Sequence, residues 1–141
     1  MKYVGSYFAY EQARNSDLMR AYETVFNAHR GAKKEEIYKR VVEMPSSRFW
    51  VSEERAATIV LNIIKGDKLK SMKPKKRLMY FEIYRRVMEA KKKNPDAPIS
   101  YLTFDVVSSP APQFYLTPQS AKTIISKIKR KWYEARKQSR A

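Results

Sequence analysis

An internal repeat is the feature that most constrains how this chain can fold. Residues 49–65 align without gaps to residues 114–130, with five identical and five conservative pairs among the 17 positions. The identical pairs are Phe49/Phe114, Ala56/Ala121, Thr58/Thr123, Ile59/Ile124 and Ile63/Ile128. Two unrelated amphipathic helices would rarely agree this often, so the alignment predicts two copies of one small structural unit.

Each copy is expected to fold as three helices, which makes the protein all-α, with two tandem related three-helix units at residues 1–66 and 67–141. In the first copy, Ser16 is the expected cap of a helix that ends near Gly31, and a short helix follows at residues 33–44. In the second copy, Pro74 opens a helix to about residue 93. Ser100 is the expected cap of a short helix that ends near residue 107.

The third helix of each copy has the clearest pattern. Ser52 and Thr117 are the expected N-caps, and Pro118 follows Thr117 at the first helical position. Each helix then carries one apolar stripe at spacing i, i+3, i+4 and i+7: Ala56, Ile59, Val60 and Ile63, and Ala121, Ile124, Ile125 and Ile128. A short helix, a turn and a capped helix with an early alanine on its core side are typical of a helix-turn-helix module.

The positive charge of the chain is concentrated in its second half. The 141 residues include 30 Lys and Arg against 14 Asp and Glu, a net charge of +16, and residues 66–141 contribute +13 of it. No fold requires this excess, so it indicates a polyanionic partner. No apolar run reaches the ~18 residues of a membrane span, and the N-terminus shows no export signal. We therefore expect a soluble cytoplasmic protein that binds no membrane.

The helical period predicts which side chains of the last helix point away from the core. The predicted nucleic-acid-binding residues of this helix are Gln119, Lys122, Thr123, Ser126, Lys127, Arg130, Tyr133 and Lys137. In a DNA major groove, Gln and Arg can bond to base edges while Ser, Thr and Lys hold phosphates. The same face of the first copy has Glu53 and Glu54, which would repel phosphates, and Leu61. We expect the second copy to bind DNA, and the first to be structural or to contact a protein partner or a second copy.

Other residues are assigned to supporting roles. Lys75, Lys76 and Arg77 precede a helix start and are expected to hold phosphates. Trp132 continues the apolar stripe of the last helix, so we expect it to be buried; stacking on an exposed base, as in single-strand or RNA recognition, is the alternative. The N-terminal aromatic residues are expected to pack against the bundle: Tyr3, Tyr7, Phe8 and Tyr10.

Residue types that support catalysis or metal binding are scarce. The chain has no cysteine and one histidine, His29, which removes thiolate chemistry, Cys-type zinc sites and most Ser-His-Asp arrangements. The adjacent pairs Glu35-Glu36 and Glu53-Glu54 point in different helical directions and cannot converge as an acid/base pair. Three scattered glycines form no phosphate-binding loop. We expect no catalytic residues, no cofactor and no metal.

The phrase Pro-Ser-Ser-Arg-Phe-Trp-Val-Ser-Glu-Glu-Arg-Ala at residues 45–56, with its partner at residues 114–121, resembles small helix-turn-helix DNA-binding proteins of bacterial phages and mobile elements. The resemblance covers the two segments that run from a short helix into a longer one. It implies a regulatory or accessory role on DNA, such as transcription regulation. The acidic start of the helix after Ser52 departs from that pattern.

The sequence thus predicts a non-enzymatic protein that binds double-stranded DNA through its last helix. A protein that binds RNA or single strands is the first alternative, favoured if Tyr133 or Trp132 is exposed on the basic face. A second alternative is a structural or assembly component of a nucleoprotein, whose first copy docks onto a partner. A basic amphipathic helix at an anionic membrane ranks below both, because Trp132 fits the core stripe.

Overall fold

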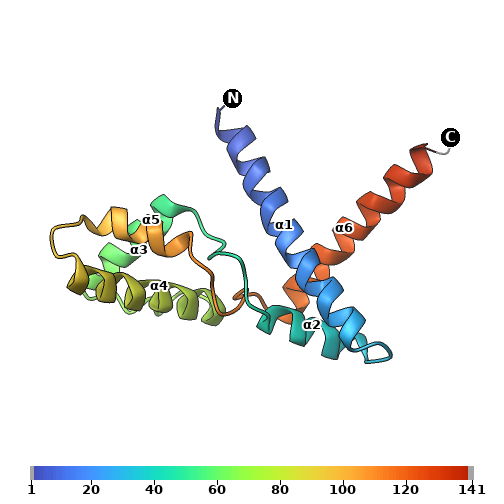
Figure 1. Ribbon diagram of the computed structural model, residues 1–141, viewed down its shortest axis with the longest axis horizontal. Helices are drawn as coiled ribbons and strands as arrows, with labels where there is room; N and C mark the ends of the chain where they lie inside the picture. Colours follow the sequence, from blue (N-terminus) through green and yellow to red (C-terminus); the bar gives the residue numbers. More distant parts are fainter. Residues whose placement is uncertain (1, 140–141) are drawn as a thin grey trace. The chain divides into compact units, whose positions relative to one another are not determined.

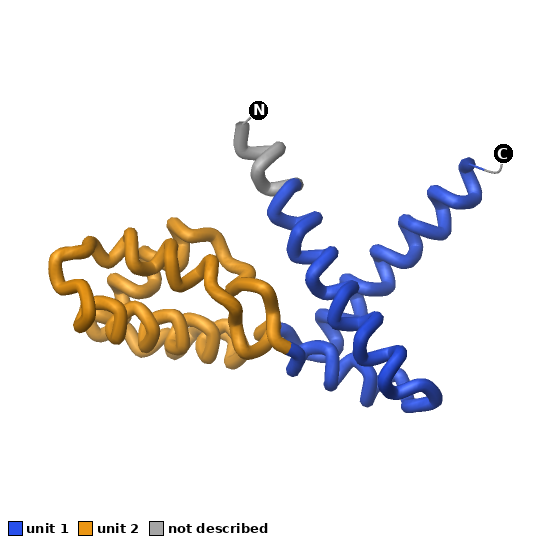
Figure 2. The backbone as a smooth tube through the Cα atoms, in the orientation of Figure 1, with its two compact units in different colours: residues 1–44, 116–141 blue, residues 45–115 orange. Residues whose placement is uncertain are grey.

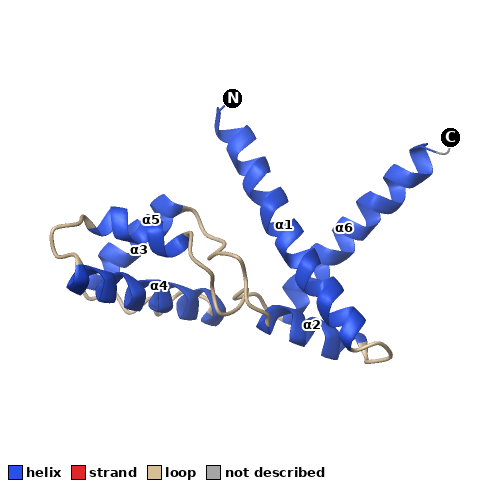
Figure 3. Cartoon of the chain, in the orientation of Figure 1, coloured by secondary structure: helices blue, strands red, loops and turns tan. Residues whose placement is uncertain are grey.

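The computed structural model describes residues 2–139, with side chains from residue 9 onward. Every regular element in this range is a helix (Figures 1 and 3), which confirms the all-α class. The helices are α1 (Lys2–Ala28), α2 (Lys34–Glu43), α3 (Glu53–Ile64), α4 (Pro74–Lys93), α5 (Ile99–Val107) and α6 (Pro118–Ser139). The side chains of Tyr3, Tyr7 and Phe8, expected to pack against the bundle, lie outside the described residues.

Helices α3, α4 and α6 begin where local chemistry predicts. The hydroxyl oxygen of Ser52 accepts a hydrogen bond from the backbone N–H of Arg55 at 3.2 Å, before α3. The hydroxyl oxygen of Thr117 accepts one from the backbone N–H of Ser120 at 3.1 Å, before α6. Each bond satisfies an N–H group that has no partner within the helix. Pro74 occupies the first turn of α4, where its missing N–H costs nothing.

Two predicted caps are wrong, and one predicted helix end is supported. Ser16 lies inside α1, because residues 9–15 contain no glycine or proline that would stop the helix. Ser100 lies in the first turn of α5; the residue before that helix is Pro98, which makes no side-chain capping bond. Gly31 follows α1 with φ of +90°, the left-handed conformation expected of a residue that terminates a helix.

The helices form two compact units that interleave along the chain. Unit 1 contains α1, α2 and α6, from residues 1–44 and 116–141, and unit 2 contains α3, α4 and α5, from residues 45–115 (Figure 2). The predicted tandem units at residues 1–66 and 67–141 are therefore not confirmed. Because α3 and α6 carry matching apolar stripes, the sequence pattern does not distinguish the two pairings.

The predicted helix-turn-helix pairs, α2 with α3 and α5 with α6, are likewise split between the units. Helix α6 contacts α1 and α2, and α3 contacts α4 and α5. The connections before α3 and after α5 contain an antiparallel bridge rather than tight turns: Ser46 and Ala111 exchange two backbone hydrogen bonds of 3.0 Å. A long, extended connection allows a helix to pack against helices other than the one that precedes it in the sequence, as in domain swapping.

The core of unit 2 combines its three helices with the segment before α3. Its large apolar side chains without exposed surface are Phe49, Val60, Ile83, Val87 and Val107. The ring of Phe49 stacks on that of Tyr115 with centroids 6.0 Å apart. The guanidinium carbon of Arg86 lies 5.0 Å from the centre of the Phe49 ring, a cation–π contact that covers the aromatic residue.

An ion-pair network on α4 supports this core. Glu82 accepts hydrogen bonds from Arg85 at 2.7 Å and from Arg86 at 2.8 Å. These bonds, that from Arg85 first, hold the pKa of the Glu82 carboxyl below its ordinary value. Arg86 also donates to the carbonyl oxygen of Pro110 at 2.8 Å, which ties α4 to the segment after α5.

The core of unit 1 is centred where its three helices meet. Its fully buried residues are Leu18, Ala21, Val41, Ala121 and Ile125. The two alanines let helices approach closely, because their side chains add little between the backbones. From this contact the N-terminal part of α1 and the C-terminal part of α6 diverge (Figure 1). Both helices are therefore longer than the core that they help to form.

Candidate nucleic-acid interface

The predicted outward face of α6 is open to solvent along its full length. We call the eight predicted residues of this helix the α6 ridge: Gln119, Lys122, Thr123, Ser126, Lys127, Arg130, Tyr133 and Lys137. All eight are exposed, and the Tyr133 side chain is the most prominent at 69%. On the opposite face Ala121 and Ile125 are buried, as the helical period requires.

The second half of α6 projects beyond the core of unit 1. No residue after Ile125 is buried, although the helix continues to Ser139. Its 22 residues span about 33 Å at 1.5 Å per residue. The helix thus presents an extended surface on which little of the length is covered by its own unit.

Most of the positive charge on α6 is available for a ligand. The helix has seven basic residues and one acidic residue, Glu134. Among the described residues, none pairs in a salt bridge with Lys122, Lys127, Arg130 or Lys137. The Thr123 hydroxyl donates to the carbonyl oxygen of Gln119 at 3.0 Å, which leaves the hydroxyl oxygen as an acceptor.

Lys129 differs from the residues of the ridge. Its Nζ donates to the hydroxyl of Tyr22 at 2.5 Å and lies 4.1 Å from the centre of that ring. Tyr22 in turn stacks on Phe26 and Tyr38, with centroids 5.8 and 6.0 Å apart. Lys129 therefore fastens α6 to α1, so this lysine, which flanks the ridge in sequence, serves packing within unit 1.

The remaining predicted site residues lie in unit 2, at the start of α4. Lys75 donates to the side-chain oxygen of Gln113 at 3.4 Å, and Lys76 is exposed. Arg77 donates to the carbonyl oxygen of Lys68 at 3.0 Å, and its guanidinium lies 5.3 Å from the centre of the Phe81 ring. The predicted set is therefore divided: its eight α6 members share one face of one helix, and the other three belong to a different compact unit.

The outer face of α3 has a different character. Glu54 and Thr58 are exposed near its start, and the Thr58 hydroxyl donates to the carbonyl oxygen of Glu54 at 3.0 Å. Leu61 and Ile64 follow with 41% and 44% of their surfaces exposed. This face offers two apolar side chains and an acidic end, where the α6 ridge offers basic and hydrogen-bonding groups.

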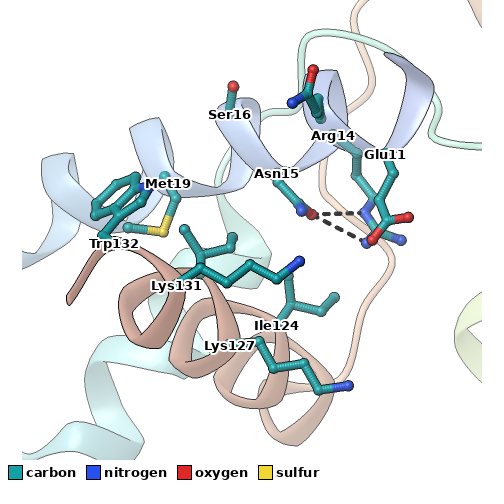
Figure 4. A pocket seen from close by; sticks show the side chains of 11 residues that line it. Glu11, Arg14, Asn15, Ser16, Met19, Ile124, Lys127, Lys131 and Trp132 are labelled. Carbon is teal, nitrogen blue, oxygen red and sulfur yellow. Dashed lines mark hydrogen bonds between the residues drawn. The ribbon is translucent and has the colours of Figure 1, made fainter. Parts of the chain in front are cut away.

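The structure also contains a groove that the sequence did not predict. It lies between α1 and α6 in unit 1 and has a volume of about 590 Å³ (Figure 4). The expectation that Trp132 is buried is wrong: its indole lines this groove and is 49% exposed. The apolar stripe of α6 continues through Ile128 to Trp132, past the point where the core ends. An apolar stripe that is longer than the core it packs against is the sequence signal that could have revealed the groove.

The described residues form neither a metal site nor a membrane-spanning helix. Between residues 2 and 139, no three His, Asp or Glu side chains gather into a group that could hold a metal ion. No helix in that range combines the length and apolar composition that crossing a membrane requires. No protein-family model, curated protein or solved structure matches this chain.

Proposed function

We propose that this chain is a non-enzymatic, cytoplasmic protein that binds double-stranded DNA through the α6 ridge and acts as a regulatory or accessory factor. One observation carries the proposal: a basic helix whose eight outward-facing predicted residues are all exposed, and whose second half lies clear of its own core. A surface that was merely solvated would not need seven basic residues on one helix beside a single acid.

The chemistry of the ridge suits the major groove. That groove is about 12 Å wide and admits one α-helix. Gln119 and Arg130 have side chains that can form paired hydrogen bonds to base edges, while Lys122 and Lys127 suit phosphates. The N-terminus of α6, with its positive dipole end, favours a phosphate beside Ser120. Base contacts and phosphate contacts would thus come from one face of one helix.

We also infer that the two units descend from one duplicated three-helix sequence whose third helices have exchanged places. In both units each helix contacts the other two. Ser46 and Ala111, which bond to each other through their backbones, stand at equivalent positions of the two copies, next to Pro45 and Pro110. Pairing between equivalent positions is expected of an exchange between two similar halves.

Binding of RNA or single strands is a second candidate, supported by the exposure of two aromatic residues. Tyr133 on the ridge is 69% exposed and Trp132 beside it 49% exposed, among Lys129, Arg130 and Lys131. Basic surfaces with exposed aromatic rings stack unpaired bases. This candidate uses the same helix as the first, so the choice between them is made by the nucleic acid that binds best.

A role in assembly is a third candidate, supported by Leu61 and Ile64 on α3. Two exposed aliphatic side chains one turn apart can anchor a protein partner or a second copy of the chain. The candidate predicts self-association or partner capture that depends on Leu61 and is unaffected by charges on α6.

Binding of a DNA duplex, a single-stranded DNA and an RNA duplex, each measured by fluorescence anisotropy at two salt concentrations, tests the proposal. We expect the DNA duplex to bind best, with a logarithmic salt slope of about −0.9 for each phosphate neutralised. Weak and equal affinity for all three would contradict specific binding by the ridge.

The variant Lys127→Ala/Arg130→Ala locates the interface. We expect it to weaken duplex binding by about tenfold or more, because two phosphate or base contacts are lost. The matched control, Lys39→Ala/Arg55→Ala, removes the same charge from exposed positions on α2 and α3 and should change affinity far less. Equal losses in the two variants would assign the binding to net charge alone.

A further inference from the structure

The groove between α1 and α6 has two unlike walls. The α6 wall carries the apolar side chains of Ile124, Ile128 and Trp132, with Lys127 and Lys131 beside them. Met19 of α1 lies next to the Trp132 indole (Figure 4). Trp132 is half exposed there, although a Trp on an apolar stripe would normally be covered by its own core. An aromatic face at the wall of a 590 Å³ groove is a surface on which a planar ligand can stack.

The α1 wall is polar. Gln12, Asn15 and Ser16 line it, and all three can donate and accept hydrogen bonds. The side-chain oxygen of Asn15 accepts bonds from Nη2 and Nε of Arg14 at 3.1 and 3.4 Å. Its amide nitrogen is therefore the group left to donate to a ligand. A groove with one apolar wall and one hydrogen-bonding wall matches a flat heterocycle, which has apolar faces and polar edges.

The charge around the groove favours an anionic ligand. Arg14, Lys127 and Lys131 stand against one acidic residue, Glu11. Lys127 belongs to the α6 ridge as well, so the groove and the ridge share a phosphate-binding side chain. An amphipathic peptide helix fits less well, because it would set apolar side chains against the amides of α1 and leave them without partners.

We propose that this groove binds an unpaired nucleobase, with Trp132 stacked on the base and the amides of α1 bonded to its edge. The proposal rests on the proposed nucleic-acid binding and specifies the ligand further: a duplex held on the α6 ridge that carries an extrahelical or single-stranded nucleotide. Lys127 and Lys131 hold the phosphates on either side of that nucleotide. The protein then prefers DNA with a local defect or a single-stranded junction over a perfect duplex.

Three probes test this preference: a fully paired DNA duplex, the same duplex with one extra cytidine, and the same duplex with an abasic residue in place of that cytidine. The two bulged probes have the same backbone length and bulge position and differ chemically only in the presence of the base. We expect the cytidine bulge to bind at least about fivefold more tightly than the abasic bulge, as base–aromatic stacking provides. Equal affinity for the two bulged probes would overturn the proposal.

Three variants locate the effect. Trp132→Leu keeps an apolar side chain and should abolish the difference between the two bulged probes, while Trp132→Phe keeps an aromatic face and should retain most of it. Tyr133→Leu is the matched control: it removes the neighbouring exposed ring, which lies on the ridge, and should preserve the difference. If Trp132→Leu lowers affinity for all three probes equally, Trp132 supports the helix and binds no base.

Fluorescence gives an independent readout. The chain has two tryptophans, so in a Trp50→Phe protein the emission comes from Trp132 alone. We expect the cytidine bulge to quench this emission and the abasic bulge to leave it nearly unchanged. Salt-sensitive binding of all three probes without selective quenching would refute the groove proposal and leave binding by the ridge intact. Failure of all three probes to bind would refute the proposed function itself.

Discussion

Helices α3 and α6 share an apolar stripe and differ in how much of each is buried and in the charge of the first turn. Five of the 12 residues of α3 are buried, against two of the 22 residues of α6. The first turn of α3 holds Glu53 and Glu54, whereas that of α6 holds no acid. The stripe decides which face of each helix is buried, and it does not decide which core buries that face. The length of helix left over and the charge on its outer face decide what the helix can bind.

The largest effects are expected when the equivalent buried side chain is truncated in the stripe of α6 and in that of α3. Ile125 and Val60 are equivalent in the repeat, and neither has exposed surface. Ile125→Ala should lower the free energy of unfolding of unit 1 by about 2–5 kcal/mol, because it leaves a cavity in a closed core, and Val60→Ala should do the same to unit 2 by a smaller amount.

Hydrogen exchange shows which helices each substitution affects. We expect Ile125→Ala to accelerate exchange in α1, α2 and α6, and Val60→Ala to accelerate it in α3, α4 and α5. Faster exchange in α4 and α5 after Ile125→Ala would favour the tandem arrangement at residues 1–66 and 67–141.

An intermediate effect on duplex affinity is expected when an acidic residue, as found in the first turn of α3, is introduced into the first turn of α6. Gln119→Glu should weaken duplex binding by about tenfold, because a carboxylate would replace the amide that we propose contacts a base, and would repel phosphates. The thermal midpoint should stay the same or rise slightly, since an acid near a helix N-terminus is favourable. Anisotropy and circular dichroism measure the two quantities. The reverse change on α3, Glu54→Gln, should leave affinity unaltered; a comparable loss there would place DNA on α3.

The smallest expected effect is a pH dependence of the stability of unit 2 that comes from Glu82. The pKa of Glu82 in unit 2 lies below its ordinary value, because Arg85 and Arg86 bond to the ionised form. Its contribution to stability is therefore complete above the ordinary pKa of a glutamate and is lost as the pH falls through the lowered one. Glu82→Gln should cost up to about 1 kcal/mol at neutral pH and flatten the loss of stability in acid.

Urea unfolding at neutral and acidic pH measures that change. Glu89→Gln is the control, because Glu89 meets Arg85 at 3.3 Å with most of its side chain in water. Its removal should have a smaller effect at either pH. If the free energy of unfolding changes with pH to the same extent in the two variants, Glu82 has no special role in unit 2.

Local chemistry explains what the sequence could predict. Caps at Ser52 and Thr117, the first-turn Pro74 and the spacing of the stripes give the starts of three helices and their inward faces. The same period places six residues of the α6 ridge on the outward face, with Lys122 and Lys127 flanking them, because a buried stripe fixes which side chains point away from it. These features depend only on residues within a few turns of each other.

Non-local choices account for what the sequence could not predict. Whether α6 completes the core of α1 and α2 or that of α4 and α5 depends on contacts between distant segments, and the matching stripes conceal the answer. The separation of Lys75, Lys76 and Arg77 from the α6 ridge follows from the same choice. So does the groove, since its polar wall comes from α1, which the sequence places in the other copy. Lys129 is a single-residue example: its packing role is evident only from its contact with Tyr22, which is distant in the sequence.

Along the chain, the residues of unit 2 lie between α2 and α6, so unit 2 is fully translated before unit 1 is complete. Helices α1 and α2 leave the ribosome before α6. Their hydrophobic faces are therefore incompletely covered until Ala121 and Ile125 have been translated. Units fold as their segments become available, so the inner unit can mature while the outer one is still incomplete. A truncated product ending before α6 would keep a finished unit 2 and lack the cationic helix altogether. Nascent chains would thus gain their proposed affinity for DNA only after α6 has been translated.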